Sequence, residues 1–152
     1  MTIGVISDTH GLLRPQALEA LQGSDLILHA GDVGPLAILD ALGAIAPTIA
    51  VRGNVDTAVW ATTLRETEVI AAERCSIVMV HDRARLAVDP RAAGHAAVVF
   101  GHSHRPLVET RQGVLFVNPG SAGPRRFDLP VTVAQLTVSG DRLEAAIVPL
   151  RV

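Results

Sequence analysis

The chain has 152 residues, the usual size of one domain, and a formal net charge of -2 with both signs interspersed. With only 3% aromatic residues and no basic stripe, the chain is not expected to bind nucleic acid stably. Its apolar runs are far shorter than the roughly 18–20 residues of a membrane span, and no secretory n-region precedes them. We therefore expect a soluble, cytoplasmic protein without membrane contact.

The first third of the chain alternates strand and helix patterns. Short apolar runs predict strands, and Pro15 with Leu18 and Leu21 marks one face of a helix. Alternation of this kind predicts a mainly parallel sheet. In order, the expected elements are a strand at 2–6, a helix at 14–21, a strand at 26–28, a helix at 35–42 and a strand at 48–51.

The remainder of the chain is richer in strands. Gly113 and Gly140 suit tight turns, so they predict two hairpins. The irregular segment 118–130 is expected to border a functional site. No linker divides the chain, so residues 1–152 are predicted to form one domain. The expected elements are strands at 68–70, 76–80 and 96–100, a helical piece at 90–94, a hairpin around 111–113, and a final hairpin of 131–137 and 143–148.

Five short motifs carry potential metal ligands, and nearly all of them follow strand-like runs. In open α/β sheets such positions meet at the carboxyl ends of the strands. Mixed carboxylate, amide and imidazole ligands suit Mn²⁺, Fe²⁺, Zn²⁺, Co²⁺ or Ni²⁺, with Mg²⁺ as a less natural choice; we expect Mn²⁺. The seven candidate ligands are Asp8, His10, Asp32, Asn54, His81, His102 and His104.

Two divalent cations at this rim would serve hydrolysis of a phosphate ester. The pair brings four positive charges, of which Asp8 and Asp32 neutralise two, so an anionic phosphate is attracted. Asp32 is expected to bridge the cations at a separation of about 3.5–4 Å, and a hydroxide activated by both would attack phosphorus. Asp32, Asn54 and His81 are the predicted catalytic residues.

The motifs together resemble the calcineurin-like metallophosphoesterase superfamily, in particular its small bacterial and archaeal phosphodiesterase branch. The resemblance spans almost the whole chain and lies in Ser7-Asp8-Thr9-His10-Gly11, Gly31-Asp32, Gly53-Asn54, Gly101-His102-Ser103-His104 and Asn118-Pro119-Gly120-Ser121. It implies an α/β fold of the α+β kind, a four-layer αββα sandwich of two mixed sheets flanked by helices. It also implies Asp8, His10, Asp32 and His104 around one metal, and Asp32, Asn54, His81 and His102 around the other.

Two positions depart from that family's pattern. Related proteins often read His-Gly-His where this chain has His81-Asp82-Arg83. Many related enzymes also place a histidine, which protonates the leaving group, where this chain has Val55. Because valine cannot transfer a proton, we expect slow turnover of esters with poor leaving groups. The next residue, Asp56, is interpreted as a turn-stabilising acid.

Other residues and other functions complete the predictions. Asn54 and Arg125 are predicted substrate contacts, because a guanidinium can bind phosphate in a bidentate manner, although a solvated loop charge is an equal alternative for Arg125. His29 either packs within the fold or orients a metal ligand. The expected partner is a small phosphate-ester substrate. A homodimer is possible, because it is the commonest oligomeric state of soluble proteins. The alternative function is a non-catalytic scaffold of the same fold, like the retromer subunit that resembles this family. A nuclease ranks lowest.

Overall fold

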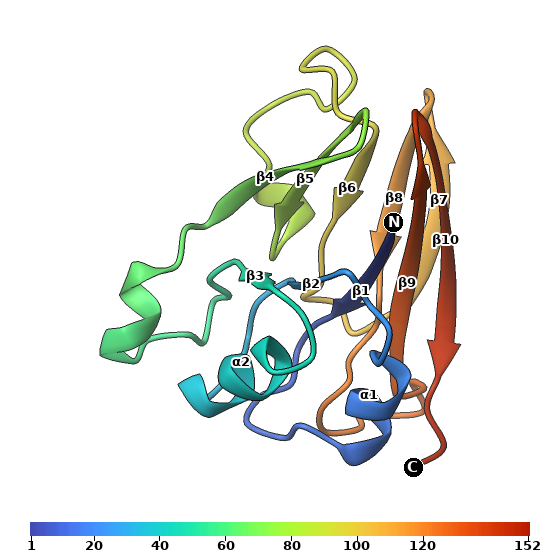
Figure 1. Cartoon of the computed structure of the whole chain (residues 1–152). Coiled ribbons are helices and arrows are strands. Elements are labelled where there is room, and N and C mark those ends of the chain that lie inside the picture. The colour runs from blue at the N-terminus through green and yellow to red at the C-terminus, as the bar shows by residue number, and fades with distance from the viewer.

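The computed structural model describes residues 1–152, and its first sheet joins the beginning and the end of the chain (Figure 1). Its strands are β1 (Thr2–Ile6), β2 (Leu26–His29), β3 (Thr48–Ala50), β9 (Thr132–Ser139) and β10 (Arg142–Pro149). They lie in the order β10-β9-β1-β2-β3. β1, β2 and β3 are parallel, whereas β9 runs antiparallel to both β1 and β10.

The second sheet consists of the middle of the chain. Its strands are β4 (Thr67–Ala72), β5 (Cys75–Val80), β6 (Ala97–Val99), β7 (Leu107–Arg111) and β8 (Val114–Asn118). They lie in the order β4-β5-β6-β8-β7, with a parallel centre formed by β5, β6 and β8. The hairpin predicted around 111–113 is confirmed. The final hairpin is also confirmed, and its first strand, β9, pairs with β1 in the first sheet.

The two sheets pack face to face around the main core. Successive side chains of a strand point to opposite faces, so Val5 and Leu28 of the first sheet meet Ile77, Met79 and Val99 of the second. All five are fully buried. This alternation gives each strand one face toward the core and one face away from it.

Helices cover the outer face of the first sheet. They are α1 (Pro15–Ala20) and α2 (Leu36–Gly43), whose buried Ala17, Ile38 and Leu42 pack against Ile6 and Ile27. No helix of the structure has the length and apolar character that crossing a bilayer requires. The predicted α/β sandwich of two mixed sheets is confirmed.

The outer layer over the second sheet is thinner than predicted. It contains the 3₁₀ turn η2 (Arg83–Arg85) and Leu86, which packs on Val78 and Phe100, but no α-helix. A second 3₁₀ helix, η1 (Val59–Thr63), precedes β4. The helical piece predicted at 90–94 is wrong: the segment is a hydrogen-bonded turn that ends at Gly94, where φ is 82°. One turn is too short to nucleate a helix.

Candidate metal centre

The predicted ligands converge where the parallel strands of both sheets end. Asp8 follows β1, Asp32 follows β2 and Asn54 follows β3, while His81 follows β5 and His102 follows β6. We call this edge of the sandwich the rim. Loops from both sheets meet there, since His81 Nδ1 lies 2.6 Å from the carbonyl oxygen of Ala30 after β2.

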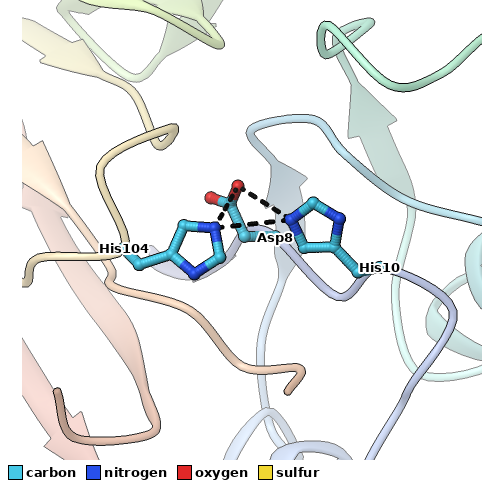
Figure 2. A group of neighbouring side chains, drawn as sticks. All are labelled: Asp8, His10 and His104. Atoms are coloured by element: carbon cyan, nitrogen blue, oxygen red, sulfur yellow. Dashed lines mark hydrogen bonds and ion pairs between the residues drawn. The ribbon is translucent and has the colours of Figure 1, made fainter. Parts of the chain in front are cut away.

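One group of ligand atoms brings together Asp8, His10 and His104 (Figure 2). His104 Nε2 lies 3.3 Å from Asp8 Oδ1, and His10 Nε2 lies 3.5 Å from the same oxygen. The two imidazole nitrogens are 3.4 Å apart. Ligand atoms of one ion, each about 2.0–2.2 Å from it, are about 3–3.5 Å from one another. The spacing therefore suits a single bound cation.

A second group shares Asp8 and adds Asp32 and His81. Asp32 Oδ2 lies 3.1 Å from His81 Nε2 and 3.7 Å from His10 Nε2, so it faces one imidazole of each predicted metal set. Its other oxygen, Oδ1, accepts the N–H of Val55. Oδ2 of Asp32 thus faces both predicted sets, and its role as the bridge stays a prediction, while Asp8 is the acid common to the two groups.

The remaining two predicted ligands, Asn54 and His102, are more exposed. Both line one pocket with His81, and the His81 and His102 ring centroids are 5.3 Å apart. His102 Nε2 lies 3.9 Å from Oδ2 of Asp82, the residue that stands where related proteins often have glycine. The structure therefore places five of the seven ligands in close clusters and these two on the open side.

Three buried polar atoms of the rim have no hydrogen-bond partner: Asp8 Oδ1, His81 Nε2 and His104 Nδ1. The tautomer of His81 makes this arrangement informative. Its Nδ1 carries the proton, because it donates to the Ala30 carbonyl, so in the neutral ring Nε2 points a lone pair at the carboxylates. Two acceptors facing one another in a buried site repel unless a positive charge, either a metal ion or a proton on Nε2, lies between them. The residues present therefore fit a bound metal.

The ionisation of the rim agrees with this chemistry. Burial raises the pKa of the Asp8 carboxyl, but the nearby imidazoles of His10 and His104 and the hydrogen bond from Ser7 outweigh it and hold the pKa well below its usual range. Burial also raises the pKa of Asp32, yet its hydrogen bonds bring that pKa below the usual value. For His81, burial lowers the pKa, while the neighbouring carboxylates outweigh burial and raise it. Both aspartates are therefore anionic at neutral pH.

The backbone of the rim is unusual in a way that no motif reveals. Five of the seven ligands have positive φ angles, namely Asp8 (55°), His10 (46°), Asp32 (56°), His102 (71°) and His104 (62°). Left-handed backbone is disfavoured for residues with a side chain, by about 1–2 kcal/mol each, and it persists only where the surroundings impose it. The fold thus holds these five residues in strained conformations.

Asp56 provides much of that constraint. Its carboxylate accepts the backbone N–H groups of Asp32 and Val33 at 2.9 Å each and of Gly53 at 2.8 Å. It therefore ties the loop after β2 to the loop after β3. The structural role predicted for Asp56 agrees with this geometry, although the sequence did not indicate that it joins two ligand loops.

Further hydrogen bonds fix Asp8 and the segment after β8. Asp8 Oδ2 accepts from Ser7 Oγ at 2.6 Å and from the N–H of His102 at 3.2 Å, which leaves Oδ1 for the imidazoles. Asn118 Nδ2 donates to the carbonyl of Gly101, and Ser121 Oγ donates to the carbonyl of Asp8. The segment beginning at residue 118 does border the site, and its contribution is to hold the ligand loops.

His29 is fully buried behind these loops. Its Nδ1 accepts the N–H of Gly31, so Nε2 carries the proton and donates to Thr9 Oγ1, which in turn donates to the carbonyl of Val33. Burial lowers the pKa of His29 to about 4. Neutral His29 therefore joins the loops that carry His10 and Asp32 without contacting either ligand, which combines the two roles left open from the sequence.

Other predicted and unpredicted residues lie around the centre. Arg125 is exposed and does not line the pocket that contains Asn54, so its substrate contact stays a prediction. Val55 is 52% exposed. The pocket also contains Arg52 and Arg85, which the sequence analysis did not single out. Neither lies in a family motif, so only the folded arrangement reveals them.

Comparison with known proteins gives one consistent result. A model of the calcineurin-like phosphoesterase superfamily domain matches residues 1–141. A protein of Methanocaldococcus jannaschii, named a probable metallophosphoesterase, is 34% identical and aligns with 99% of this chain and 82% of its own length.

Solved structures share the same two-sheet arrangement. A novel archaeal phosphodiesterase has a TM-score of 0.79 at 22% identity, over 97% of this chain and 100% of that chain. Zinc-bound Vps29 from Entamoeba histolytica has a TM-score of 0.76 at 24% identity, over 98% of this chain and 99% of that chain. At these identities the likeness supports the fold.

Proposed function

Because this chain belongs to the calcineurin-like phosphoesterase superfamily, we propose that it is a hydrolase that cleaves a small phosphodiester with two bound divalent cations. The observation that carries the proposal is the tautomer of His81. Its Nδ1 is committed to Ala30, and its Nε2, which has no hydrogen-bond partner, lies 3.1 Å from Oδ2 of Asp32. That arrangement is stable when a cation joins the two acceptors.

Two sets of residues would hold the cations. Asp8, His10, Asp32 and His104 form one set, and Asp32, Asn54, His81 and His102 form the other. Bound there, divalent cations lower the pKa of a water and neutralise charge on the phosphate oxygens. Mixed oxygen and nitrogen ligands suit Mn²⁺, Fe²⁺, Zn²⁺, Co²⁺ or Ni²⁺, of which we propose Mn²⁺, and the zinc-bound Vps29 structure shows that a protein of this fold holds a transition metal.

The chain's own residues set the electrostatics of the reaction. Asp8 and Asp32 return only two negative charges, and the amide of Asn54 adds none, so the site keeps an excess of positive charge for an anionic ester. His29, Asp56 and the bonds to Asp8 Oδ2 hold the ligand loops, so little reorganisation is needed when a substrate binds.

Preference for diesters over monoesters is part of the proposal. It is supported by the resemblance to the small phosphodiesterase branch and by the likeness in fold to an archaeal phosphodiesterase. The pocket beside the centre has a volume of about 380 Å³, which suits a small substrate. A scaffold role is the alternative, since Vps29 proteins share the fold. The complete set of seven ligands argues for catalysis.

The test is hydrolysis of bis(p-nitrophenyl) phosphate and p-nitrophenyl phosphate by metal-stripped protein, before and after addition of Mn²⁺, Ni²⁺, Zn²⁺ or Mg²⁺. Asp32→Asn is compared with Asp25→Asn, which changes an exposed aspartate at the other end of β2. We expect metal-restored turnover with the diester preferred, lost in Asp32→Asn and kept in Asp25→Asn. Metal binding without turnover of either ester would instead support the scaffold.

A further inference from the structure

The pocket beside Asn54, His81 and His102 extends away from the metal ligands toward two arginines. Arg52 follows β3 and Arg85 ends η2, so the two guanidinium groups come from different sheets. A pocket of about 380 Å³ exceeds what one phosphate group at the metals would fill. A substrate arm that fills the rest of the pocket therefore has these two cationic side chains within its lining.

Some charged side chains of the pocket have an oppositely charged partner, and others do not. Arg52 Nη2 lies 3.1 Å from Glu66 Oε1, and both side chains are partly in solvent, with 33% and 67% exposed. Asp82 accepts the N–H of Ala84 and faces His102. Arg85 has no ion-pair partner and no side-chain hydrogen bond, so it is the lining arginine that no carboxylate pairs, although Asp82 and Glu66 line the same pocket.

We propose that this pocket binds a second phosphoryl group of the substrate, through Arg85 and Arg52; the proposal rests on the phosphodiesterase function above. The reacting phosphodiester lies at the metal ligands, and one of its ester arms enters the pocket. Guanidinium groups bind phosphate with two parallel hydrogen bonds, which a neutral arm cannot use. The substrate class is accordingly a small diester with an additional phosphate, of the kind found in phosphorylated nucleotides.

Glu66 distinguishes this proposal from a structural role, because its removal should have the opposite effect on phosphate binding from removal of the arginines. An ion pair that is largely in solvent contributes little, so a phosphate can replace Glu66 at Arg52. Removing the Glu66 charge should therefore strengthen binding of the second phosphate, whereas removing either arginine should weaken it. A purely structural role of the Arg52–Glu66 pair predicts losses from both changes.

The experiment uses the metal-loaded protein and two substrates that share one reacting group: the p-nitrophenyl ester of thymidine 5′-phosphate, with or without a 3′-phosphate. We expect the 3′-phosphate to lower KM by about tenfold or more, since charge-assisted hydrogen bonds are the strong ones. Arg85→Gln and Arg52→Gln should bring the ratio of the two KM values near one. Glu66→Gln should increase it.

Two control variants test the location. Arg65→Gln removes one positive charge from the segment next to Glu66, outside the pocket. Arg105→Gln removes one from the neighbouring pocket on the other side of His102. Neither should change the KM ratio. An unchanged ratio in Arg85→Gln, or a loss in Arg105→Gln, would overturn the assignment.

A binding measurement separates this inference from the proposed function. Calorimetry compares thymidine 3′,5′-bisphosphate with thymidine 5′-phosphate on the same metal-loaded variants. Tighter binding of the bisphosphate that depends on Arg85 supports the pocket even if neither ester is hydrolysed, in which case only the proposed activity fails. Equal affinity for both nucleotides contradicts the pocket even if both esters are hydrolysed.

Discussion

The two ends of the sandwich use the same rare backbone conformation for different purposes. At the end opposite the rim, the hairpin turns contain Glu73 and Gln112, whose φ angles are 51° and 50° (Figure 1). These residues are exposed, and Gln112 with Gly113 follows the local rule of two-residue turns. At the rim, positive φ occurs at buried Asp8, Asp32 and His104, with no hairpin to require it. Local sequence explains the first end, and long-range contacts explain the second.

The space around glycines differs in the same way. A side chain at Gly113 or Gly140 would meet nothing within 4 Å. A Cβ at Gly53 would collide with Asp32, and one at Gly101 would collide with Ser7 and approach Asp8 Oδ2 to 2.6 Å. At the rim, the backbone of these glycines therefore packs directly against carboxylate side chains, whereas the hairpin end has open space around its glycines. Changes at the rim should damage chemistry and stability together, and changes at the hairpins should do little to either.

The largest expected difference is between one acid at each end. Asp8→Asn should remove a charge shared by both ligand groups and reduce turnover at least about a thousandfold, with loss of bound metal. Glu73→Gln changes an exposed side chain that accepts the N–H of Gly140, and it should leave turnover unchanged. Metal analysis and bis(p-nitrophenyl) phosphate hydrolysis check both. Equal turnover in the two variants would remove the contrast.

A pair of glycines tests packing next. Gly53→Ala should lower the free energy of unfolding of the metal-free protein by about 3 kcal/mol, because the methyl group displaces Asp32. Gly113→Ala should lower it by about 1 kcal/mol, through backbone strain at φ 79° alone. Urea unfolding measures both values. Losses of the same size would show that the rim is no more tightly packed than the hairpin end.

The pH dependence of stability is a third distinction, and it follows from His29. Burial lowers its pKa from 6.5 to about 4 in the folded protein. Below pH 6.5 the unfolded chain takes up a proton that the folded protein does not accept until about pH 4, so stability from neutral His29 falls as the pH drops through that range. The slope is about 1.4 kcal/mol per pH unit.

Urea unfolding of metal-free wild type and His29→Gln at pH 7.5 and 4.5 measures this contribution. The wild type should lose about 2 to 3 kcal/mol more than the variant between these pH values. Parallel losses in the two proteins would mean that His29 is not held neutral by the rim.

The smallest expected effect concerns Val55, whose side chain is 52% exposed although its N–H binds Asp32. Val55→His adds a proton donor without adding buried volume. It should accelerate diesters with poor leaving groups about tenfold relative to p-nitrophenyl esters. Val55→Gln is the matched polar control without an acid. Equal acceleration of both ester types would exclude general acid catalysis at this position.

These contrasts show how far the sequence could predict the molecule. Short apolar runs predicted the strands, and turn residues such as Gly113 and Gly140 predicted the hairpins, because both signals are local. The sheet that the final hairpin joins could not be predicted, since pairing of β9 with β1 depends on residues more than 100 positions apart. The segment 90–94 was misjudged because one turn and a short helix share the same local pattern.

The candidate site divides along the same line. Its candidate ligands follow strand ends in recognisable motifs, so all seven could be named from residue type and position, and the structure brings five of them into close clusters. The contacts of Asp56 with Asp32 and of His29 with Thr9 join loops that are more than 15 residues apart, and no local pattern indicates them. The same holds for Arg52 and Arg85, which become neighbours of one pocket only when the two sheets pack.

The most direct test of the account is a titration of metal-free protein with Mn²⁺, in which bound metal and bis(p-nitrophenyl) phosphate hydrolysis are measured on the same sample. Two ligand sets that share Asp32 predict that turnover rises mainly with the second ion and reaches its maximum at two ions per chain. Full turnover with one bound ion, or two bound ions without turnover, would contradict the two-metal phosphodiesterase.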